Sequence, residues 1–586
     1  MKMKLIFMFT ILSGLLTLNL CAQDRGKALA VVMDMVHHNP GEPFTQSIFN
    51  DPRTLKDYGF NAQVINEFQS VHCAITYESL DKDIFPTGSK ERLWVDSLAN
   101  RISRKIDAIH AQGLNAYYFT DIIVLPRKLV EIYKDEICDN NGNIDISRPK
   151  TQEIHRIMLK EVFERFPTLD GLIIRVGETY LHNIPYHIGN GPIKKNEKKT
   201  SSITYRSDGG EAIHRDLMNL LRDEVCVKLN KKIFYRTWDF GYFHTVPEYY
   251  LNVTEYVPTH PNLFICVKHV RGDYHRMHKF NPTLGIGKHK QVVEVQCQRE
   301  YEGKGAYPNY IADGVLNGFE ELRNDVEPYC LNQLKTNPIF AGIWTWSRGG
   351  GWVGPYITNE LWCELNTYVL AQWAKDTHLT EGEICKEFAR NKGMDGINAE
   401  KFCQLALLSA DAIVRGRASL IDNINVWWTR DQFISGSDEL DFVGFIRRGN
   451  VERLLAEKKE SIAIWKRMRD IAYSLEGTEK EILKYIRSST DYGFILYSIF
   501  EQGFLIMMKG AEGDLTGVYD IRTLKKAFRN YDKLWKDYET LKNKNSECAT
   551  LYKPYSFNSR FAPSYCDREK GLKCSVDKYR MIAFER

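Results

Sequence analysis

Residues 264–273 read FICVKHVRGD, a short apolar run with β-branched residues that ends in polar and charged residues. The same arrangement recurs at residues 172–180, LIIRVGETY, and at residues 292–301, VVEVQCQREY. Each run has the length and composition of a buried strand. A barrel of parallel strands carries its chemistry at the carboxyl ends of the strands. These three stretches therefore predict both a fold class and the place of its site.

Strand-like runs alternate with helix-like segments over the first 350 residues. The amphipathic stretches between the runs include residues 92–109, 153–166 and 211–229. Alternation predicts a parallel sheet, and eight repeats predict a closed (β/α)8 TIM barrel of the α/β class. The eight runs lie at residues 28–33, 62–65, 116–119, 172–176, 233–238, 264–268, 292–296 and 341–346.

After residue 352 the pattern becomes helical. Thr380 and Glu383 have the spacing of a capping box that opens a helix. Helical periodicity follows at residues 399–421, 451–472, 480–509 and 521–544, so an all-helical C-terminal domain is expected. The predicted organisation is a signal peptide at 1–22, a catalytic barrel at 23–355, a helical domain at 356–550 and an irregular tail at 551–586.

The amino terminus has the pattern of an export signal. Lys2 and Lys4 precede an uncharged apolar run at residues 5–20, which is short for a membrane span. We therefore expect a periplasmic or secreted protein with no membrane span. A lipid anchor at Cys21 is less favoured, because Leu20 is larger than the residue that a lipidation signal places there.

Charge and cysteine content exclude several classes of protein. The 79 basic and 75 acidic residues leave a formal net charge of +4, which argues against a nucleic-acid partner. The 13 cysteines form no CxxC pair, so neither a metal site nor a cofactor is expected. Cys566 and Cys574 flank a short polar loop and are the best candidates for a disulfide.

Three acids stand where predicted strands end: Glu178, Asp273 and Glu300. Cleavage of a glycosidic bond needs one carboxylic acid to protonate the leaving oxygen and one carboxylate to activate water or attack the sugar. The alternative for Glu178 is a salt bridge at the barrel rim. Spacing alone does not separate Glu300 from Glu302, and Glu294, in the middle of its strand, is a candidate for a buried, inward-pointing, paired group.

Basic and aromatic residues accompany these acids. Arg236 lies on the fifth predicted strand and Lys268 ends the sixth. They either neutralise the acids or bind a carboxylate of the substrate, and chemistry alone rates the two roles equally. The full set of candidate substrate-binding residues is Arg236, Lys268, Arg175, Trp238, Tyr301 and Trp352.

At these positions the chain resembles the catalytic barrel of family 67 glycoside hydrolases, the α-glucuronidases. The resemblance extends from residue 169 to residue 352 and into residues 366–388. The matching motifs are Gly177-Glu178 after the fourth strand, Tyr235-Arg236 on the fifth, Lys268 to Asp273 after the sixth, Gln296 to Gly303 after the seventh, with Glu300 in the acid's place, and Trp352-Val353-Gly354 after the eighth.

The resemblance implies an inverting reaction in which Glu178 is the general acid and Asp273 and Glu300 hold and activate the water. It also implies that Arg236 and Lys268 contact the carboxylate of the uronic acid. The chain departs from the family in three respects. The stretch Ile174-Arg175-Val176-Gly177 before the acid stands where the family has a Lys-containing run. The family's N-terminal β-rich domain is not recognisable ahead of the barrel, and the loop at residues 180–205 is longer and carries a basic cluster.

The leading hypothesis is an exported, exo-acting, inverting glycosidase that releases an α-linked uronic acid, with glucuronic acid as first choice, from an oligosaccharide or polysaccharide. A second hypothesis is a retaining barrel glycosidase that uses Glu178 and Glu300. A third, from another class, is a non-catalytic glycan-binding protein, because fold does not imply function. The helical domain is the candidate interface for a homodimer.

We predict that Glu178→Gln nearly abolishes hydrolysis of natural glycosides but spares aryl glycosides with an activated leaving group. An amide cannot donate a proton, and a good leaving group needs little protonation. Asp273→Asn and Glu300→Gln serve as comparison variants and should slow both substrates, because attack by water is common to the two. Steady-state kinetics on both substrates checks this, and equal losses for Glu178→Gln would contradict the general-acid role.

Overall fold

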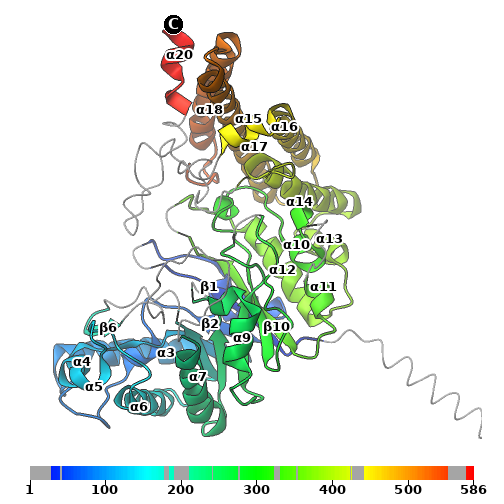
Figure 1. Ribbon diagram of the computed structural model, residues 1–586. Coiled ribbons are helices and arrows are strands. Elements are labelled where there is room, and N and C mark those ends of the chain that lie inside the picture. Colours follow the sequence, from blue (N-terminus) through cyan, green and yellow to red (C-terminus); the bar gives the residue numbers. More distant parts are fainter. Residues whose placement is uncertain are drawn as a thin grey trace, which may run out of the picture.

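The computed structural model describes residues 28–39, 42–176, 184–189, 210–239, 242–274, 277–322, 330–351, 354–422, 424, 441–551 and 576–585. Eight parallel strands close into a barrel in the order β1-β10-β9-β8-β7-β5-β3-β2 (Figure 1). The predicted (β/α)8 barrel is thus confirmed. The strands are β1 (Val31–Val36), β2 (Ala62–Ile65), β3 (Asn115–Asp121), β5 (Gly171–Arg175), β7 (Lys232–Arg236), β8 (Leu263–Lys268), β9 (Lys290–Gln296) and β10 (Phe340–Arg348).

The predicted strand positions differ from the observed ones mainly at the first strand. Its observed start is Val31 and not residue 28, because the equally apolar Leu29 instead donates its backbone N–H to Ala374 of a helix beside the barrel, at 2.8 Å. Two further strands, β4 (Val124–Pro126) and β6 (His187–Gly189), pair antiparallel outside the barrel. Strands of three residues are too short to give a periodic signal, so the sequence did not predict them.

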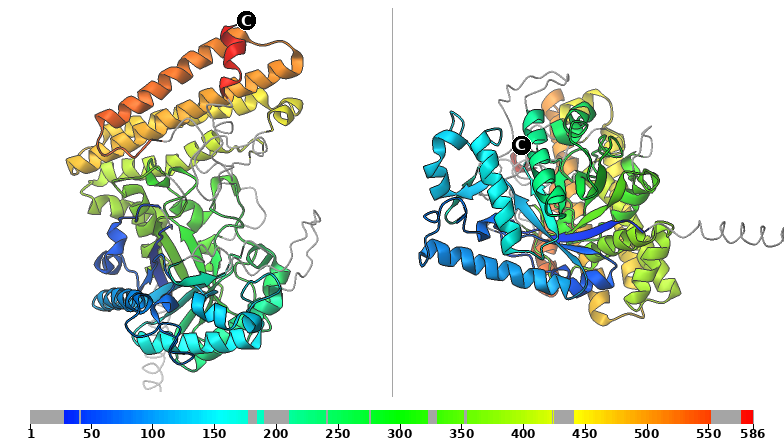
Figure 2. Two further views of the ribbon diagram at one scale, coloured as in Figure 1. Left: turned by 90° about the vertical axis from the view of Figure 1, so that its left-hand side faces the viewer. Right: turned by 90° about the horizontal axis from the view of Figure 1, so that it is seen from below.

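Helices that follow the strands surround the barrel, as the view along it shows (Figure 2, right). The predicted helices at 92–109, 153–166 and 211–229 correspond to α3, α6 and α7, and a π-helical turn at Arg222–Val227 continues α7. The helices of this part of the chain are α2 (Pro52–Asp57), α3 (Lys90–His110), α4 (Arg127–Ile132), α5 (Lys134–Ile137), α6 (Pro149–Arg165), α7 (Gly210–Leu221), α8 (Tyr242–Thr245), α9 (Pro247–Thr254), α10 (Ala312–Asn317) and α11 (Leu331–Leu334).

The described residues after the barrel form helices joined by loops and include no strand, as predicted. Its long helices pack side by side, α14 on α16, α16 on α17 and α17 on α18, and form a layer over the barrel (Figure 2, left). The capping box of Thr380 and Glu383 opens α13. The helices are α12 (Leu361–Lys375), α13 (Glu381–Asn391), α14 (Gly396–Arg417), α15 (Phe442–Arg447), α16 (Val451–Ser474), α17 (Lys480–Thr516), α18 (Ile521–Lys544) and α20 (Arg580–Phe584).

A buried carboxyl group joins the first and last strands where the barrel closes. Asp34 on β1 accepts hydrogen bonds from the hydroxyls of Thr345 and Ser347 on β10, at 2.6 and 2.7 Å, and from the Ser347 N–H at 3.1 Å. Complete burial raises the pKa of the Asp34 carboxyl to about 7, although these hydrogen bonds act to lower it. Closure therefore depends on polar contacts as well as on the strand ladder.

The helical region contacts the loop that follows β9. Asn366 of α12 is buried and donates its side-chain N–H to the carbonyls of Cys297 and Asn309, at 3.1 and 2.9 Å. Its side-chain oxygen accepts the backbone N–H of Ile311 at 2.9 Å. Tyr485 of α17 donates its hydroxyl to the Gly305 carbonyl at 2.9 Å. The two regions therefore share a hydrogen-bonded contact at the carboxyl end of the barrel.

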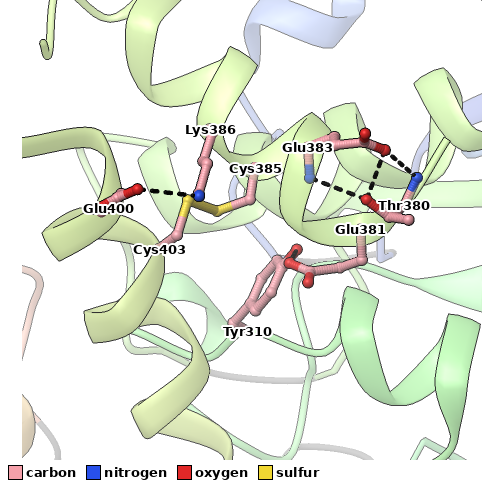
Figure 3. The surroundings of a disulfide bond; sticks show 8 residues. All are labelled: Tyr310, Thr380, Glu381, Glu383, Cys385, Lys386, Glu400 and Cys403. Atoms are coloured by element: carbon pink, nitrogen blue, oxygen red, sulfur yellow. Dashed lines mark hydrogen bonds and ion pairs between the residues drawn. A yellow bond between two sulfur atoms is a disulfide. The ribbon is translucent and has the colours of Figure 1, made fainter. Parts of the chain in front are cut away.

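A disulfide joins α13 to α14 within the helical region (Figure 3). It links Cys385 to Cys403, and an ion pair of 3.2 Å between Lys386 and Glu400 joins the same two helices. The pair predicted from the sequence, Cys566 and Cys574, lies outside the described residues. The described residues include eight further cysteines, all of which are buried free thiols.

Two segments of the predicted organisation lie largely beyond the part of the chain that is described. Residues 1–27 contain the predicted signal peptide and Cys21, and residues 552–575 make up most of the predicted tail. The signal peptide and the domain boundaries at residues 22, 355 and 550 stay predictions. None of the helices among the described residues combines the length and the apolar character needed to cross a membrane.

We predict that Cys385→Ala/Cys403→Ala lowers the free energy of unfolding by about 3 kcal/mol, because a link across 18 residues restricts the unfolded chain. Reductant should shift the urea midpoint of the wild type, followed by circular dichroism, but not that of the double variant. Cys330→Ala removes a buried free thiol and is the matched control, which should stay sensitive to reductant. A reductant-insensitive wild type would contradict the prediction.

Candidate active site

Five neighbouring strands carry charged side chains into the barrel near their carboxyl ends. Two residues earlier on each strand, apolar side chains fill the barrel interior: Phe119, Ile173, Phe234, Cys266 and Val292. Side chains two residues apart on a strand share a face, so the charged residues point inward above this apolar layer. They are Asp121 on β3, Arg175 on β5, Arg236 on β7, Lys268 on β8 and Glu294 on β9.

Four of these charges form two buried ion pairs. Arg175 forms a two-pronged ion pair with Asp121, in which Nε contacts Oδ1 and Nη2 contacts Oδ2 at 2.8 Å. Arg236 contacts Glu294 in the same way, through Nε at 2.9 Å and Nη2 at 2.5 Å, and Tyr274 adds a hydroxyl donor to Glu294 at 3.1 Å. The reading of Glu294 as an inward, buried and paired group is therefore confirmed. Buried charges need such partners, because an unpaired charge in the interior costs several kcal/mol.

Aromatic rings enclose the Arg236 guanidinium. Its central carbon lies 5.4 Å from the ring centres of Phe119 and Trp344 and 5.3 Å from that of Trp346. His37, which follows β1, stacks on Trp346 at 4.7 Å. Burial, and after it the charge of Arg175, lowers the pKa of His37 well below its usual range, so the imidazole is neutral. The floor of the barrel mouth is therefore lined by aromatic rings, and its two arginines are each paired with a carboxylate.

Asp273 is held from two sides. The Lys268 ammonium contacts Oδ1 at 2.5 Å, and the Tyr301 hydroxyl donates to Oδ2 at 2.5 Å. Lys268 also lies 3.6 Å from the ring centre of Trp238 and 4.6 Å from that of Tyr274. Both contacts to Asp273 favour the anionic carboxylate over the acid. Since Tyr301 is the neighbour of Glu300, the loops after β8 and β9 meet at this point.

Glu300 stands in a tightly constrained turn. Its backbone N–H donates to the Gln296 side-chain oxygen at 2.7 Å, and the preceding Arg299 has a left-handed φ of 59°. A Cβ at Gly351, whose φ is 66°, would lie only 2.8 Å from the Glu300 Cβ, and one at Gly350 would collide with the Gln296 amide. Only glycine, which has no Cβ, lets the backbone after β10 come so close to Gln296 and Glu300. Backbone strain of this kind concentrates at functional sites.

Glu302 has different surroundings from Glu300. Its carboxylate forms a buried ion pair with Arg299 at 2.9 Å and accepts a hydrogen bond from the Asn309 amide at 2.9 Å. These contacts hold the loop after β9 together. They give Glu302 a structural role and leave Glu300 as the acid beside the glycine turn, a distinction that sequence spacing could not make.

The candidate residues thus fall into three groups. Asp273, Lys268, Trp238 and Tyr301 lie together, with Glu300 next in sequence to Tyr301. Arg175 and Arg236 lie deeper, each on a carboxylate of the barrel itself, and their contact with a substrate stays a prediction. Glu178 and Trp352 lie outside the described residues.

Sequence reasoning missed Asp121, Gln296 as the support of Glu300, and the run Gly349 to Gly351. A signal was available for two of them. Asp121 ends the run YYFTD as the other acids end theirs, and three consecutive glycines after a strand mark a close approach of the backbone.

Three buried polar atoms at the same end of the barrel, His37 Nδ1, Gln296 Nε2 and Trp346 Nε1, have no hydrogen-bond partner among the described residues. Similar atoms occur elsewhere in the protein, so these three do not by themselves mark a ligand site. No group of three or more His, Cys, Asp and Glu side chains suited to a metal ion occurs in the described part of the chain.

Comparison with known proteins gives similarity of fold alone. No protein-family model matches the sequence, and no curated protein matches it. Among solved structures, a GH138 enzyme targeting pectin rhamnogalacturonan II aligns with 95% of this chain and 67% of its own, at 12% identity and a TM-score of 0.55. CpGH84B (9% identity, 94% and 77% covered) and an O-GlcNAc hydrolase mutant from Thermobaculum terrenum (10% identity, 89% and 94% covered) align with TM-scores of 0.42 and 0.37.

We predict that Arg236→Met lowers the free energy of unfolding by about 3–5 kcal/mol, because it leaves the Glu294 charge unpaired in the interior. Arg236→Met/Glu294→Leu should recover much of this loss, since no buried charge then remains. Urea denaturation followed by circular dichroism measures both.

The matched control for this prediction is Lys228→Met, which breaks an exposed pair with Glu224 and should cost under about 1 kcal/mol. If Arg236→Met proved as stable as the wild type, Arg236 would not be neutralising Glu294, and its role would lie with the substrate.

Proposed function

We propose that this protein is an exo-acting glycoside hydrolase that releases an α-linked uronic acid from a glycan by an inverting mechanism. One observation carries the proposal: the strand-end acids Asp273 and Glu300 lie on touching loops at the carboxyl end of a closed eight-stranded barrel. That is where barrel enzymes carry their chemistry. The shared fold with a GH138 enzyme supports a glycosidase, and the α-glucuronidase resemblance of the motifs supports the uronic acid.

The surroundings of the acids suit distinct roles. Asp273 is held as an anion by Lys268 and Tyr301, which fits a group that orients and deprotonates water and not a proton donor. Glu300 is fixed by Gln296 and the glycine turn and lies on the adjoining loop. Glu178 is proposed as the general acid because its strand-end position matches the acid of the resembling family.

Lys268 is the proposed contact for the uronate carboxylate. An ammonium has three donors, and Asp273 accepts one of them. The flanking rings of Trp238 and Tyr274 favour a cation at this position through their π faces. A substrate carboxylate that shares Lys268 with Asp273 would be recognised by charge, whereas a neutral hexose would not.

The proposed location is the periplasm or the extracellular space. It rests on Lys2, Lys4 and the apolar run at residues 5–20, which have the order of an export signal. A glycan substrate outside the cytoplasm agrees with this placement.

Proton NMR of the products from a panel of α-linked uronosides tests the function and the mechanism together. Inversion releases the β-anomer of the uronic acid first, and mutarotation follows. The α-anomer first would replace the proposal by a retaining mechanism with Glu178 and Glu300. Binding without any product would leave a non-catalytic glycan-binding protein.

We predict that Lys268→Met lowers kcat/KM for an aryl α-uronoside by roughly 100-fold, since hydrogen bonds to charged groups contribute about 1.5–3 kcal/mol and a bound anion would lose its partner. The ratio of uronoside to neutral hexoside turnover is the decisive readout, because it cancels any disturbance of Asp273.

Lys232→Met is the matched control for this prediction. Lys232 begins β7 at the opposite end of the barrel, where it donates to the Tyr117 hydroxyl at 2.9 Å, and its loss should leave the ratio unchanged. A wild type that cleaves the neutral hexoside as well as the uronoside would reject uronic acid specificity and keep the glycosidase.

A further inference from the structure

A cavity lies beside the barrel, between the ends of its first two strands and α3. Its volume is about 310 Å³, within the range of about 300–1,000 Å³ typical of small-ligand pockets. Val36 and Ile65 in its wall belong to the apolar cluster that packs against the helices, and not to the cluster inside the barrel. Among the described residues, the loops that carry Asp273 and Glu300 contribute nothing to its lining. The cavity is therefore separate from the candidate active site.

Two buried side chains bring hydrogen-bond donors to this cavity. His38 and Asn66 are 5% and 6% exposed and both line it. The Asn66 side-chain oxygen accepts the His38 backbone N–H at 3.0 Å, and His38 Nδ1 accepts the backbone N–H of Thr45 at 3.3 Å. Burial, and after it the charge of Lys105, lowers the pKa of His38 to about 3, so the ring is neutral and its proton lies on Nε2. The Nε2–H of His38 and the amide N–H groups of Asn66 have no acceptor within the described chain, which leaves them for a ligand.

The cavity also presents hydrogen-bond acceptors, and its charge is balanced. The Gln63 amide nitrogen donates to the carbonyls of Phe49 and Asn50, at 3.1 and 3.3 Å, so the Gln63 side-chain oxygen is left to accept. The one charged residue in the described lining, Lys105, forms an ion pair with Glu67. The polar part of the lining therefore consists of neutral donors and acceptors.

An aromatic ring closes one side of the cavity. Phe44 stacks on His38, with ring centres 3.7 Å apart and planes at 21°, and it is 43% exposed. A sugar ring has a face of C–H groups and a rim of hydroxyls, each of which both donates and accepts hydrogen bonds. Such a ring matches an aromatic surface beside mixed donors and acceptors. A uronic acid matches less well, because its carboxylate would be buried beside a lysine that already has a partner.

We propose that this cavity binds an uncharged sugar residue of a glycan, as an accessory site apart from the candidate acids. The hydroxyls of the sugar bond to His38, Asn66 and Gln63, and its apolar face lies on Phe44. The proposal goes beyond the proposed reaction, since it gives the protein a second contact with a glycan that carries neutral sugars.

Saturation-transfer NMR with the methyl glycosides of glucose, galactose, xylose and rhamnose tests the site, and methyl glucuronide is the charged probe. The wild type should bind at least one neutral glycoside saturably. Ala108→Trp, at an exposed position of α3 that lines the cavity, should abolish this binding, because an indole would fill the space. It should leave any binding of methyl glucuronide unchanged. Ala456→Trp is the matched control, at an exposed alanine of another long helix, α16, and should bind as the wild type does.

Phe44→Ala is the second variant in case Ala108→Trp does not fold by circular dichroism. Loss of the ring should weaken binding of the neutral glycoside by roughly 3-fold or more. Phe584→Ala is its control, because Phe584 on α20 is 44% exposed and should not affect binding. The proposal is overturned if the wild type binds no neutral glycoside, if the cavity variants bind like the wild type, or if they lose methyl glucuronide and the neutral glycosides alike.

Failure of the proposed function gives a different result, because the NMR experiment measures binding and not turnover. A protein that hydrolyses no uronoside would lose the proposed reaction, and the binding of neutral glycosides would still decide the accessory site. If uronosides are hydrolysed, Ala108→Trp should leave kcat/KM for an aryl α-uronoside unchanged. A variant that slows this substrate would make the cavity part of the active site and would overturn the accessory role.

Discussion

The need to neutralise charge inside the barrel determines how its mouth is built. Arg236 on β7 and Glu294 on β9 pair with each other across the intervening strand β8. Lys268 on β8 therefore cannot take either as its main partner, and its counter-charge must come from above the strand layer. Asp273 supplies it by folding the loop after β8 back over the barrel. The position of a candidate catalytic acid thus follows from charge balance among three neighbouring strands.

The loop after β9 is held in place by the segment that follows β10 and by helix α12. Gly350 and Gly351, which follow β10, pack against it, and Asn366 of α12 holds its two ends by binding Cys297 and Asn309. The helical region therefore acts as a support for the acid-bearing loop, and not only as a cover for apolar surface. Support from rigid elements reduces the motion of a functional side chain, which matters where displacements of about 1 Å change rates strongly.

Much of the fold could be predicted because its signals are local. The eight β-branched runs and the helical periodicity at residues 521–544 depend on neighbouring residues, and α18 begins and ends at the predicted positions. The strand-end acids could be named for the same reason. The partner of Arg236, the choice of Glu300 over Glu302, and the disulfide of Cys385 and Cys403 depend on which elements meet in space. No spacing rule in a single sequence contains that information.

The two kinds of cation in the barrel differ in what they can still offer a ligand. The planar guanidinium of Arg236 donates two hydrogen bonds to Glu294 and lies among three aromatic rings. This geometry fixes the orientation of the guanidinium and uses two of its donors on one partner. Lys268 is a point charge with three donors on a flexible stem, and it contacts Asp273 at the edge of the charged layer. An anion that enters from the mouth meets the lysine before the arginine. Charge selectivity in such a site is therefore expected from Lys268, with Arg236 keeping the floor beneath it neutral and rigid.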